Sequence, residues 1–505
     1  MASTSGLGSA IVWPAEDGTT SPLLDASVRQ CLEQEILPDY VAQCRWYGAK
    51  DAGRPVVRIR EVRRFPALCG KIELCLLDLC PPGLPAQTYF LPLIEDWTAR
   101  SSPSALCAIT RDGQTGLLRD ALTEPQVVAT LVEAIRRGSS VQGIAFHHTA
   151  AFDKLAQSLP SPPPVHFMAA EQSNCSVRVG EVAILKALRK LEPGLHPELE
   201  MGRFLTETAH YAHTPPLLGW AELAGTESEA VTLCVMQQMV PNQGDGWSHV
   251  LACLREADPA DEARLTAWIE RLGQRTAELH LALAQDGAAE AFRPEAVDGA
   301  VLQNWHEGCR SMARRILSSL RQARPNLTGE SAAAADRLLS QDQAVMDWIK
   351  DTALSREVLD HGGFVRTRIH GDFHLGQVLV SDDDAFIIDF EGEPMRPLEE
   401  RRAKSSPLRD VAGMLRSFAY AAASVPETPR GWEDQACAAF LTAYRATAHA
   451  CPSLPPDPDD AASLLRLFLM EKALYEVGYE LANRPDWLPI PLGGVLDLLS
   501  STRNP

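Results

Sequence analysis

The chain has 505 residues and a formal net charge of −19, from 47 lysines and arginines against 66 aspartates and glutamates. This acidic balance argues against nucleic acid or an anionic membrane as a main partner, because both are bound through basic patches. A hydrophobic content of 45% and a charged content of 22% exclude a disordered chain. The length suggests about two to four structural units.

The 12 cysteines form no C-x-x-C pair, which favours buried thiols over disulfides or a zinc site. The N-terminal residues lack a basic stretch followed by an apolar stretch, and no run approaches the ~18 apolar residues of a spanning helix. We therefore expect a soluble, cytoplasmic protein in a reducing compartment.

In chain order, residues 1–20 are expected to form a flexible tail, and residues 23–44 a helix, because apolar side chains recur there at helical spacing. Three alternating runs, VVRIREVRRF, KIELCLLDL and TYFLPLIE, predict strands, and residues 117–140 predict a second helix. The segment SLPSPPPVH (158–166) has four prolines in nine residues, which is typical of a linker. We therefore place an N-terminal cap subdomain at 21–157.

Residues 158–240 are expected to form a small sheet-rich lobe, because strand, strand, helix, strand and strand patterns follow one another there. Residues 241–505 predict a mainly helical C-terminal lobe. A strand-rich island at 368–394 interrupts the helical pattern. Within it, the apolar runs VLV and AFIID flank the polar turn SDDD, so a hairpin is expected.

The island carries the residues with the clearest chemistry. His370-Gly371-Asp372 is followed by Gln377 and then by Asp389, a spacing that resembles the H-R-D-x-x-x-x-N and D-F-G motifs of protein kinases. Two letters depart from those motifs, glutamine in place of asparagine and glutamate in place of the last glycine. An aspartate can accept the proton of an attacking hydroxyl, and Mg²⁺ prefers oxygen ligands. We expect Asp372 to be the base, and Asp389 with Gln377 to hold the metal.

The island also resembles the maltokinases, relatives of the aminoglycoside phosphotransferases in the protein-kinase-like superfamily. The resemblance covers nearly the whole chain beyond residue 20, except 286–365. Its motifs are RWYGAKD (45–51), EQSNCSV (171–177), VPNQGDGW (240–247), HGDFHLGQVL (370–379), DFEGEP (389–394), the charged run 396–418 and the segment 469–492.

This resemblance implies an α+β, bilobal, kinase-like fold with ATP and Mg²⁺ as cofactors. It implies that His370 and Asp372 are catalytic, and that the reaction converts maltose to maltose 1-phosphate in trehalose and glycogen metabolism. Trehalose synthase is then the expected partner. Two alternatives stay open: a kinase of another sugar such as glucosamine, or a catalytically inactive kinase-like partner of trehalose synthase.

The nucleotide end is expected around AILKAL (183–188), because a lysine in an apolar strand needs a partner. Kinases pair such a lysine with a glutamate on the next helix. The resemblance favours Glu200 as the partner of Lys186, with Glu198 as the neighbouring alternative. It also places a polar loop over the phosphates and a hinge in VMQQMV (235–240). The residues assigned to these two segments are Ser173, Asn174, Ser176, Gln237 and Met239.

The acceptor end is expected on the helix that contains MEKALYEVGYELANRPDW. At 3.6 residues per turn, polar and aromatic side chains share a face opposite a stripe of Leu474, Val477 and Leu481. The alternative is that the tyrosines pack on a neighbouring helix and the charges form a surface pair. The resemblance favours a sugar-binding face formed by Lys472, Tyr475, Glu476, Tyr479 and Asn483.

Two further motifs receive less definite roles. The charged run RPLEERRAKSSPLRD is as consistent with structural ion pairs as with substrate contact. Trp46 and Tyr47 are expected to be structural in the cap.

Overall fold

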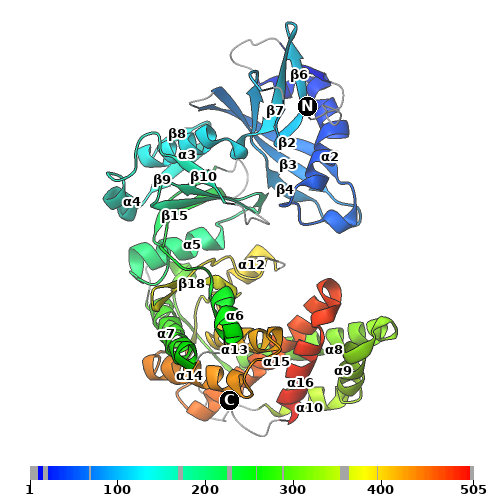
Figure 1. Cartoon of the computed structure of the whole chain (residues 1–505), viewed down its shortest axis with the longest axis vertical. Helices are drawn as coiled ribbons and strands as arrows, with labels where there is room; N and C mark the ends of the chain where they lie inside the picture. The colour runs from blue at the N-terminus through cyan, green and yellow to red at the C-terminus, as the bar shows by residue number, and fades with distance from the viewer. Residues whose placement is uncertain are drawn as a thin grey trace. The chain divides into compact units, whose positions relative to one another are not determined.

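The structure is a computed structural model, and it divides into two compact units (Figure 1). The first contains Met1–Arg203 and Pro215–Met239, and the second contains Phe204–Thr214 and Val240–Pro505. No helix in the described part of the chain is long and apolar enough to span a bilayer. The described residues are 10–14, 21–67, 70–99, 101–168, 174–224, 230–256, 259–286, 289–352, 363–394 and 396–500.

The first unit contains a sheet in the order β1-β6-β7-β5-β3-β4-β13, with β2 beside β3. The strands are β1 (Ile11–Val12), β2 (Val56–Ala67), β3 (Gly70–Cys80), β4 (Gln87–Phe90), β5 (Leu93–Asp96), β6 (Ala105–Arg111), β7 (Gln114–Asp120) and β13 (Lys190–Leu191). Leu77 and Leu79 of β3 pack with Val28 and Val41 from the helices α1 (Ala26–Cys31) and α2 (Leu37–Gln43), which a five-residue π-helical segment joins. The alternate residues of β3 join a second core, so the strand is buried on both faces.

Within the expected 1–20 tail, the described residues 10–14 include a short strand. Ile11–Val12 pairs in parallel with β6, and the Trp13 amide donates to the Thr110 carbonyl at 2.7 Å. Trp13 is only 2% exposed, so burial of its indole fixes this segment on the cap sheet.

A second sheet in the same unit has the order β10-β11-β12-β15-β14-β9-β8. Its strands are β8 (Ser140–Val141), β9 (Ile144–His148), β10 (Val165–Phe167), β11 (Cys175–Val179), β12 (Ala183–Ala187), β14 (Leu217–Leu223) and β15 (Val231–Gln238). Three helices pack against this sheet: α3 (Pro125–Arg137), α4 (Ala150–Leu155) and α5 (Pro197–Arg203). The expected succession of elements over 167–240 is present.

Two details differ from the sequence-based expectation. Residues 117–120 belong to β7, and the helix starts at Pro125, whose fixed φ suits a first helical turn. The proline-rich segment 158–166 is not a linker between two separate units. Leu159 lies in the core that both sheets share, and β10 begins at Val165. Strands β8 and β9 precede that segment yet belong to the second sheet.

The second unit is mainly helical, as expected for residues 241–505. Its helices are α6 (Gly246–Glu256), α7 (Pro259–Leu283), α8 (Gly299–Ala323), α9 (Gly329–Leu339), α10 (Asp342–Asp351), α12 (Leu398–Arg401), α13 (Leu408–Ser424), α14 (Trp432–Thr447), α15 (Pro458–Asn483) and α16 (Pro489–Ser500). Figure 1 shows α15 and α16 beside α8 and α9, and α15 also packs on α13. The sheet-rich unit and the helical unit confirm the predicted α+β class.

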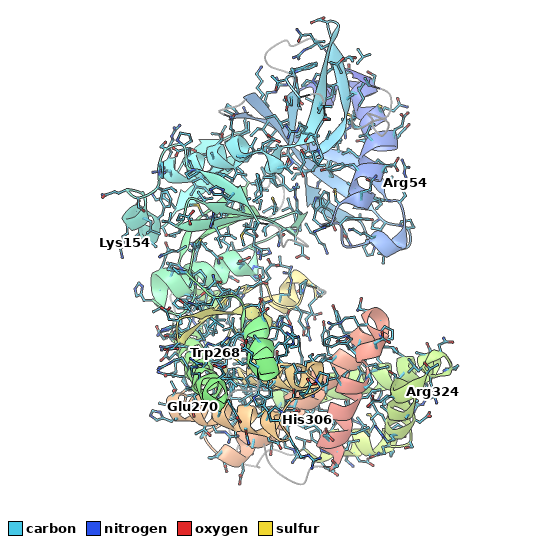
Figure 2. The ribbon with its side chains drawn as sticks, viewed as in Figure 1. Arg54, Lys154, Trp268, Glu270, His306 and Arg324 are labelled. Atoms are coloured by element: carbon cyan, nitrogen blue, oxygen red, sulfur yellow. The ribbon has the colours of Figure 1, made fainter. Side chains whose placement is uncertain are left out.

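The strand-rich island forms the predicted hairpin from β18 (Val378–Ser381) and β19 (Asp384–Ile387). Helix α7 holds its turn, because the Trp268 indole donates to the Asp384 carbonyl at 3.2 Å and Arg275 donates twice to the Asp384 carboxylate. Figure 2 labels Trp268 among the side chains of this unit. A small antiparallel pair, β16 (Glu295–Ala296) with β17 (Val365–Arg366), precedes the His370–Asp372 segment.

Candidate active site

The backbone before Asp372 is clamped by a buried carboxylate on α13. The amides of His370 and Gly371 donate to the two oxygens of Asp410 at 2.8 and 2.9 Å. Burial by itself would raise the pKa of Asp410, but His280, His370 and the Gly371 amide outweigh burial and lower it. Gly371 has φ +85°, a left-handed conformation that side chains disfavour. This clamp fixes the turn that presents Asp372.

His370 lines neither of the two cavities that Lys472 and Tyr475 line. Its ring Nε2 is 2.9 Å from the Ile388 carbonyl, and the ring packs against Phe373 and Phe390. The side chain is only 2% exposed. These contacts tie the Asp372 turn to the residue before Asp389, which is a positioning contact, and a catalytic role for His370 stays a prediction.

Gln377 and Asp389 flank the base of the hairpin. The Ile388 amide donates to the Gln377 carbonyl at 3.0 Å, so Gln377 is hydrogen-bonded to the residue that precedes Asp389. Asp389 has φ +66°, a strained conformation for a non-glycine residue. Their oxygen donors match the preference of Mg²⁺, which would be held by the Asp389 carboxylate and the Gln377 amide oxygen.

In the first unit, strand register fixes the predicted nucleotide lysine. Lys186 of β12 faces Ser176 of β11, and its Nζ lies 2.9 Å from the carboxylate of Glu198 on α5. Among the described residues, the ion-pair partner of Lys186 is Glu198, the alternative to the favoured Glu200. Residues two apart on a helix point about 200° apart, so only one of the two glutamates can face the strand.

The structure describes four of the other five predicted nucleotide contacts, and their roles stay predictions. Ser173 lies outside the described residues, and the Asn174 side chain accepts from the Arg189 amide at 3.4 Å. Gln237 pairs with Ile184 within the sheet. The Met239 amide donates to the Val182 carbonyl at 2.8 Å, so an adenine contact at this residue would use its carbonyl or side chain.

The five predicted acceptor residues line one cavity of about 1020 Å³ in the helical unit. Asp372, at the end of the clamped turn, also lines this cavity, and its side chain is 23% exposed. The volume lies at the upper end of ordinary ligand sites, about 300–1,000 Å³. The lining includes Asp245, Trp247, Arg315, Asp372, His374, Tyr420, Lys472, Tyr475, Glu476, Tyr479, Glu480, Asn483, Arg484 and Trp487.

Lys472 lies between two carboxylates. Its Nζ is 3.1 Å from Glu393 and 3.7 Å from Asp372. Burial alone would lower the pKa of the Lys472 ammonium, but Glu393, Asp372 and Glu476 outweigh burial and raise it. The lysine therefore stays charged beside the predicted base.

A sequence profile of the phosphotransferase enzyme family (APH) matches residues 169–448, more than half of the chain. The chain belongs to this family. It is 27% identical over 409 residues to a glucosamine kinase of Streptacidiphilus jiangxiensis, with 77% of this chain and 85% of that one covered. It is 26% identical over 343 residues to a glucosamine kinase of Mycolicibacterium smegmatis, with 66% and 79% covered.

A solved glucosamine kinase in complex with glucosamine, ADP and inorganic phosphate superposes with a TM-score of 0.61. The superposition covers 92% of this chain and 99% of that one, at 22% sequence identity. This likeness supports the kinase-like fold of the phosphotransferase. The names of these relatives do not confirm the specific resemblance to maltokinases.

Several charged groups of this phosphotransferase's cavity are already paired. Glu476 accepts from Arg416 Nε at 2.9 Å, and Glu480 accepts from the Tyr420 hydroxyl at 3.1 Å and from Arg484. Arg416 and Glu480 were not predicted. Both residues lie on helices, outside any short motif that would mark them as part of a site. Their role becomes visible only because α13 packs on α15.

The charged run 396–410 mainly forms ion pairs. Arg396 pairs with Glu393, Arg409 with Glu471, and Lys404 with Glu295. The same three cations line a smaller cavity of about 250 Å³, next to Lys472 and Tyr475. In the first unit, Tyr47 is buried and Trp46 packs against Tyr89 with ring centroids 5.5 Å apart, which is consistent with their expected structural role in the cap.

Proposed function

We propose that this phosphotransferase transfers the γ-phosphoryl group of ATP to a hydroxyl of a small sugar, with glucosamine as the first acceptor to test. The observation that carries the proposal is the clamped turn, which opens Asp372 into a cavity lined by aromatic rings and hydrogen-bonding groups. Rings that cover C–H faces beside polar groups that bond hydroxyls suit a carbohydrate.

In the proposed step, Asp372 orients the sugar hydroxyl and takes its proton, while the hydroxyl oxygen forms a bond to the γ-phosphorus. The bond between that phosphorus and the β,γ-bridging oxygen breaks, and ADP leaves. Lys186, held by Glu198, binds phosphate oxygens. Mg²⁺ held by Asp389 and Gln377 would neutralise developing negative charge on the phosphates.

The choice of acceptor rests on the relatives, both named glucosamine kinases. Maltose is the second candidate, and cavity size favours it. A volume of about 1020 Å³ exceeds what a monosaccharide needs, and two pairs of stacked rings, Tyr475 with Tyr479 and Tyr420 with Trp487, offer an extended surface. An association with trehalose synthase belongs to this second candidate only.

An acceptor screen tests the proposal. Purified protein with ATP and Mg²⁺ is offered glucosamine, glucose, N-acetylglucosamine and maltose, and ADP release is measured. We expect the highest kcat/KM for glucosamine. The highest value for maltose would restore the maltokinase hypothesis. Failure to release ADP with every sugar, in folded protein that binds ATP, would contradict the proposed reaction and favour an inactive kinase-like protein.

A further inference from the structure

The motif VPNQGDGW (240–247) places the carboxylate of Asp245 against the hairpin formed by β18 and β19. The Gln243 amide donates to the Val380 carbonyl at 2.8 Å, and the Val380 amide donates to the Gly244 carbonyl at 2.9 Å. Asp245 continues this ladder opposite Leu379. The segment therefore forms an added edge on β18, and the position of Asp245 is set by the same hairpin that follows Asp372.

Gly246 makes that position possible. A Cβ atom at residue 246 would lie 3.0 Å from the Leu375 carbonyl and 2.9 Å from the ring of Trp268, the residue labelled in Figure 2. Any side chain there would push the segment away from the catalytic loop. The glycine thus allows close contact between the backbone beside Asp245 and the loop that contains Asp372.

The cavity's carboxylates differ in their ionic partners. Asp372 faces Lys472, Glu476 pairs with Arg416, and Glu480 pairs with Arg484. Among the residues that the structure describes, no lysine, arginine or histidine forms an ion pair with Asp245. Its carboxylate caps α6, accepting from the Ser248 amide at 2.7 Å on Oδ1 and from the Ser248 hydroxyl at 3.3 Å on Oδ2.

We propose that Asp245 is the subsite that binds the ammonium group of an aminosugar acceptor. The inference rests on the proposed sugar-kinase function and names the substrate class of that same site. An ammonium ion would supply the cation that this carboxylate lacks, and Oδ2, which carries only one long hydrogen bond, can accept from it. Trp247, which lines the same cavity, adds an aromatic ring next to the subsite.

Arg315 provides the matching comparison. It lines the same cavity from α8, is exposed, and has no ion pair with any residue that the structure describes. A guanidinium can donate to the hydroxyls that glucosamine and glucose share. Asp245 should therefore separate glucosamine from glucose, whereas Arg315 should contribute equally to both.

The test uses the full-length protein and the substitution Asp245→Asn. Asparagine is as good a helix cap as aspartate, so the change removes the charge and keeps the fold of α6. The kcat/KM ratio of glucosamine to glucose is measured below the pKa of the glucosamine amine, with Arg315→Gln as the matched control. A charged hydrogen bond predicts that Asp245→Asn lowers this ratio about tenfold to a hundredfold, and that Arg315→Gln leaves it unchanged.

Binding titrations of glucosamine and glucose, followed by calorimetry, accompany the kinetics. An Asp245→Asn variant that loses both sugars by the same factor would overturn the inference, because a purely structural cap would act in this way. A wild-type ratio retained in the variant would also overturn it. Wild-type protein that binds glucosamine through Asp245 but releases no ADP would contradict the proposed reaction while supporting the subsite.

Discussion

Two lysines of the molecule, one in each unit, are held by buried glutamates at similar distances. Lys186 lies 2.9 Å from Glu198, and Lys472 lies 3.1 Å from Glu393. The first pair joins a strand to the next helix of the chain. The second joins a C-terminal helix to the segment after the hairpin, 79 residues away, and also faces Asp372.

The difference lies in what each ammonium can do for a reaction. We infer that Lys186 is positioned to meet the phosphates of a nucleotide. Lys472 is shared between Glu393 and the proposed base, so its charge acts on the acceptor side. Substitutions that remove one partner at a time therefore separate phosphate binding from acceptor chemistry.

The largest expected effect comes from Asp372→Asn, which removes the proposed base and leaves Lys472 with Glu393. Loss of a general base typically costs about 10²–10⁴-fold in kcat. Nucleotide binding should stay near the wild-type value, because the Lys186–Glu198 pair is untouched. Steady-state kinetics with a nucleotide titration check both statements. A kcat close to wild type would show that Asp372 is not the base.

Glu393→Gln should act on stability as well as on activity. Removing one partner of a buried ion pair lowers the free energy of unfolding by about 3–5 kcal/mol. We expect the lower value, because Lys472 would keep Asp372 as a second partner. Burial would raise the pKa of Glu393, but Lys472 and Arg396 outweigh burial and lower it. The ion pair therefore stabilises the fold above the ordinary carboxyl pKa of about 4.3, and this contribution is lost as the pH falls through the lowered value.

Urea unfolding of the wild type and of Glu393→Gln at neutral and acidic pH tests that sign. The gap between the two unfolding free energies should narrow as the pH falls below about 4. A gap that stays constant with pH would mean that charge on Glu393 contributes nothing to the fold.

The substitutions Glu198→Gln and Glu200→Gln test the ion pair of Lys186 in the first unit. Glu198 forms an ion pair with Lys186, so its loss should raise the KM for ATP about tenfold, the cost of one interaction between charged groups. Glu200→Gln is the matched control two residues along the same helix, and it should change that KM far less. Equal effects in the two variants would contradict the assignment of the partner.

The smallest effect is expected from Tyr479→Ala. Tyr479 is 42% exposed and stacks on Tyr475 with ring centroids 6.5 Å apart, so its removal should not unfold α15. Loss of about 1 kcal/mol of ring contact should raise the acceptor KM roughly fivefold and leave the ATP KM unchanged. A lower melting temperature with an unchanged acceptor KM would place Tyr479 in packing only.

Residue patterns within single segments of the sequence predicted the features that depend on neighbouring residues. The hairpin, the helical face with Lys472 and Tyr475, and a partnered Lys186 all follow from residue spacing within a few turns or strands. The sequence did not predict the Asp410 clamp, the Arg416 partner of Glu476 or the ordered Trp13. Each depends on a contact between segments distant in the chain, and spacing within one segment has no information about which distant group will neutralise a buried charge.

The seam between the two sheets of the first unit limits how far the chain can be shortened. Arg189, 3% exposed, donates to Asp120 at 2.6 Å, so a protein beginning at residue 158 would keep the buried guanidinium and lose its carboxylate. The same deletion would remove β8 and β9 and leave β14 as a free sheet edge. Unpaired edges of this kind recruit other strands, so a shortened chain covering only residues 169–448 should aggregate and not fold alone.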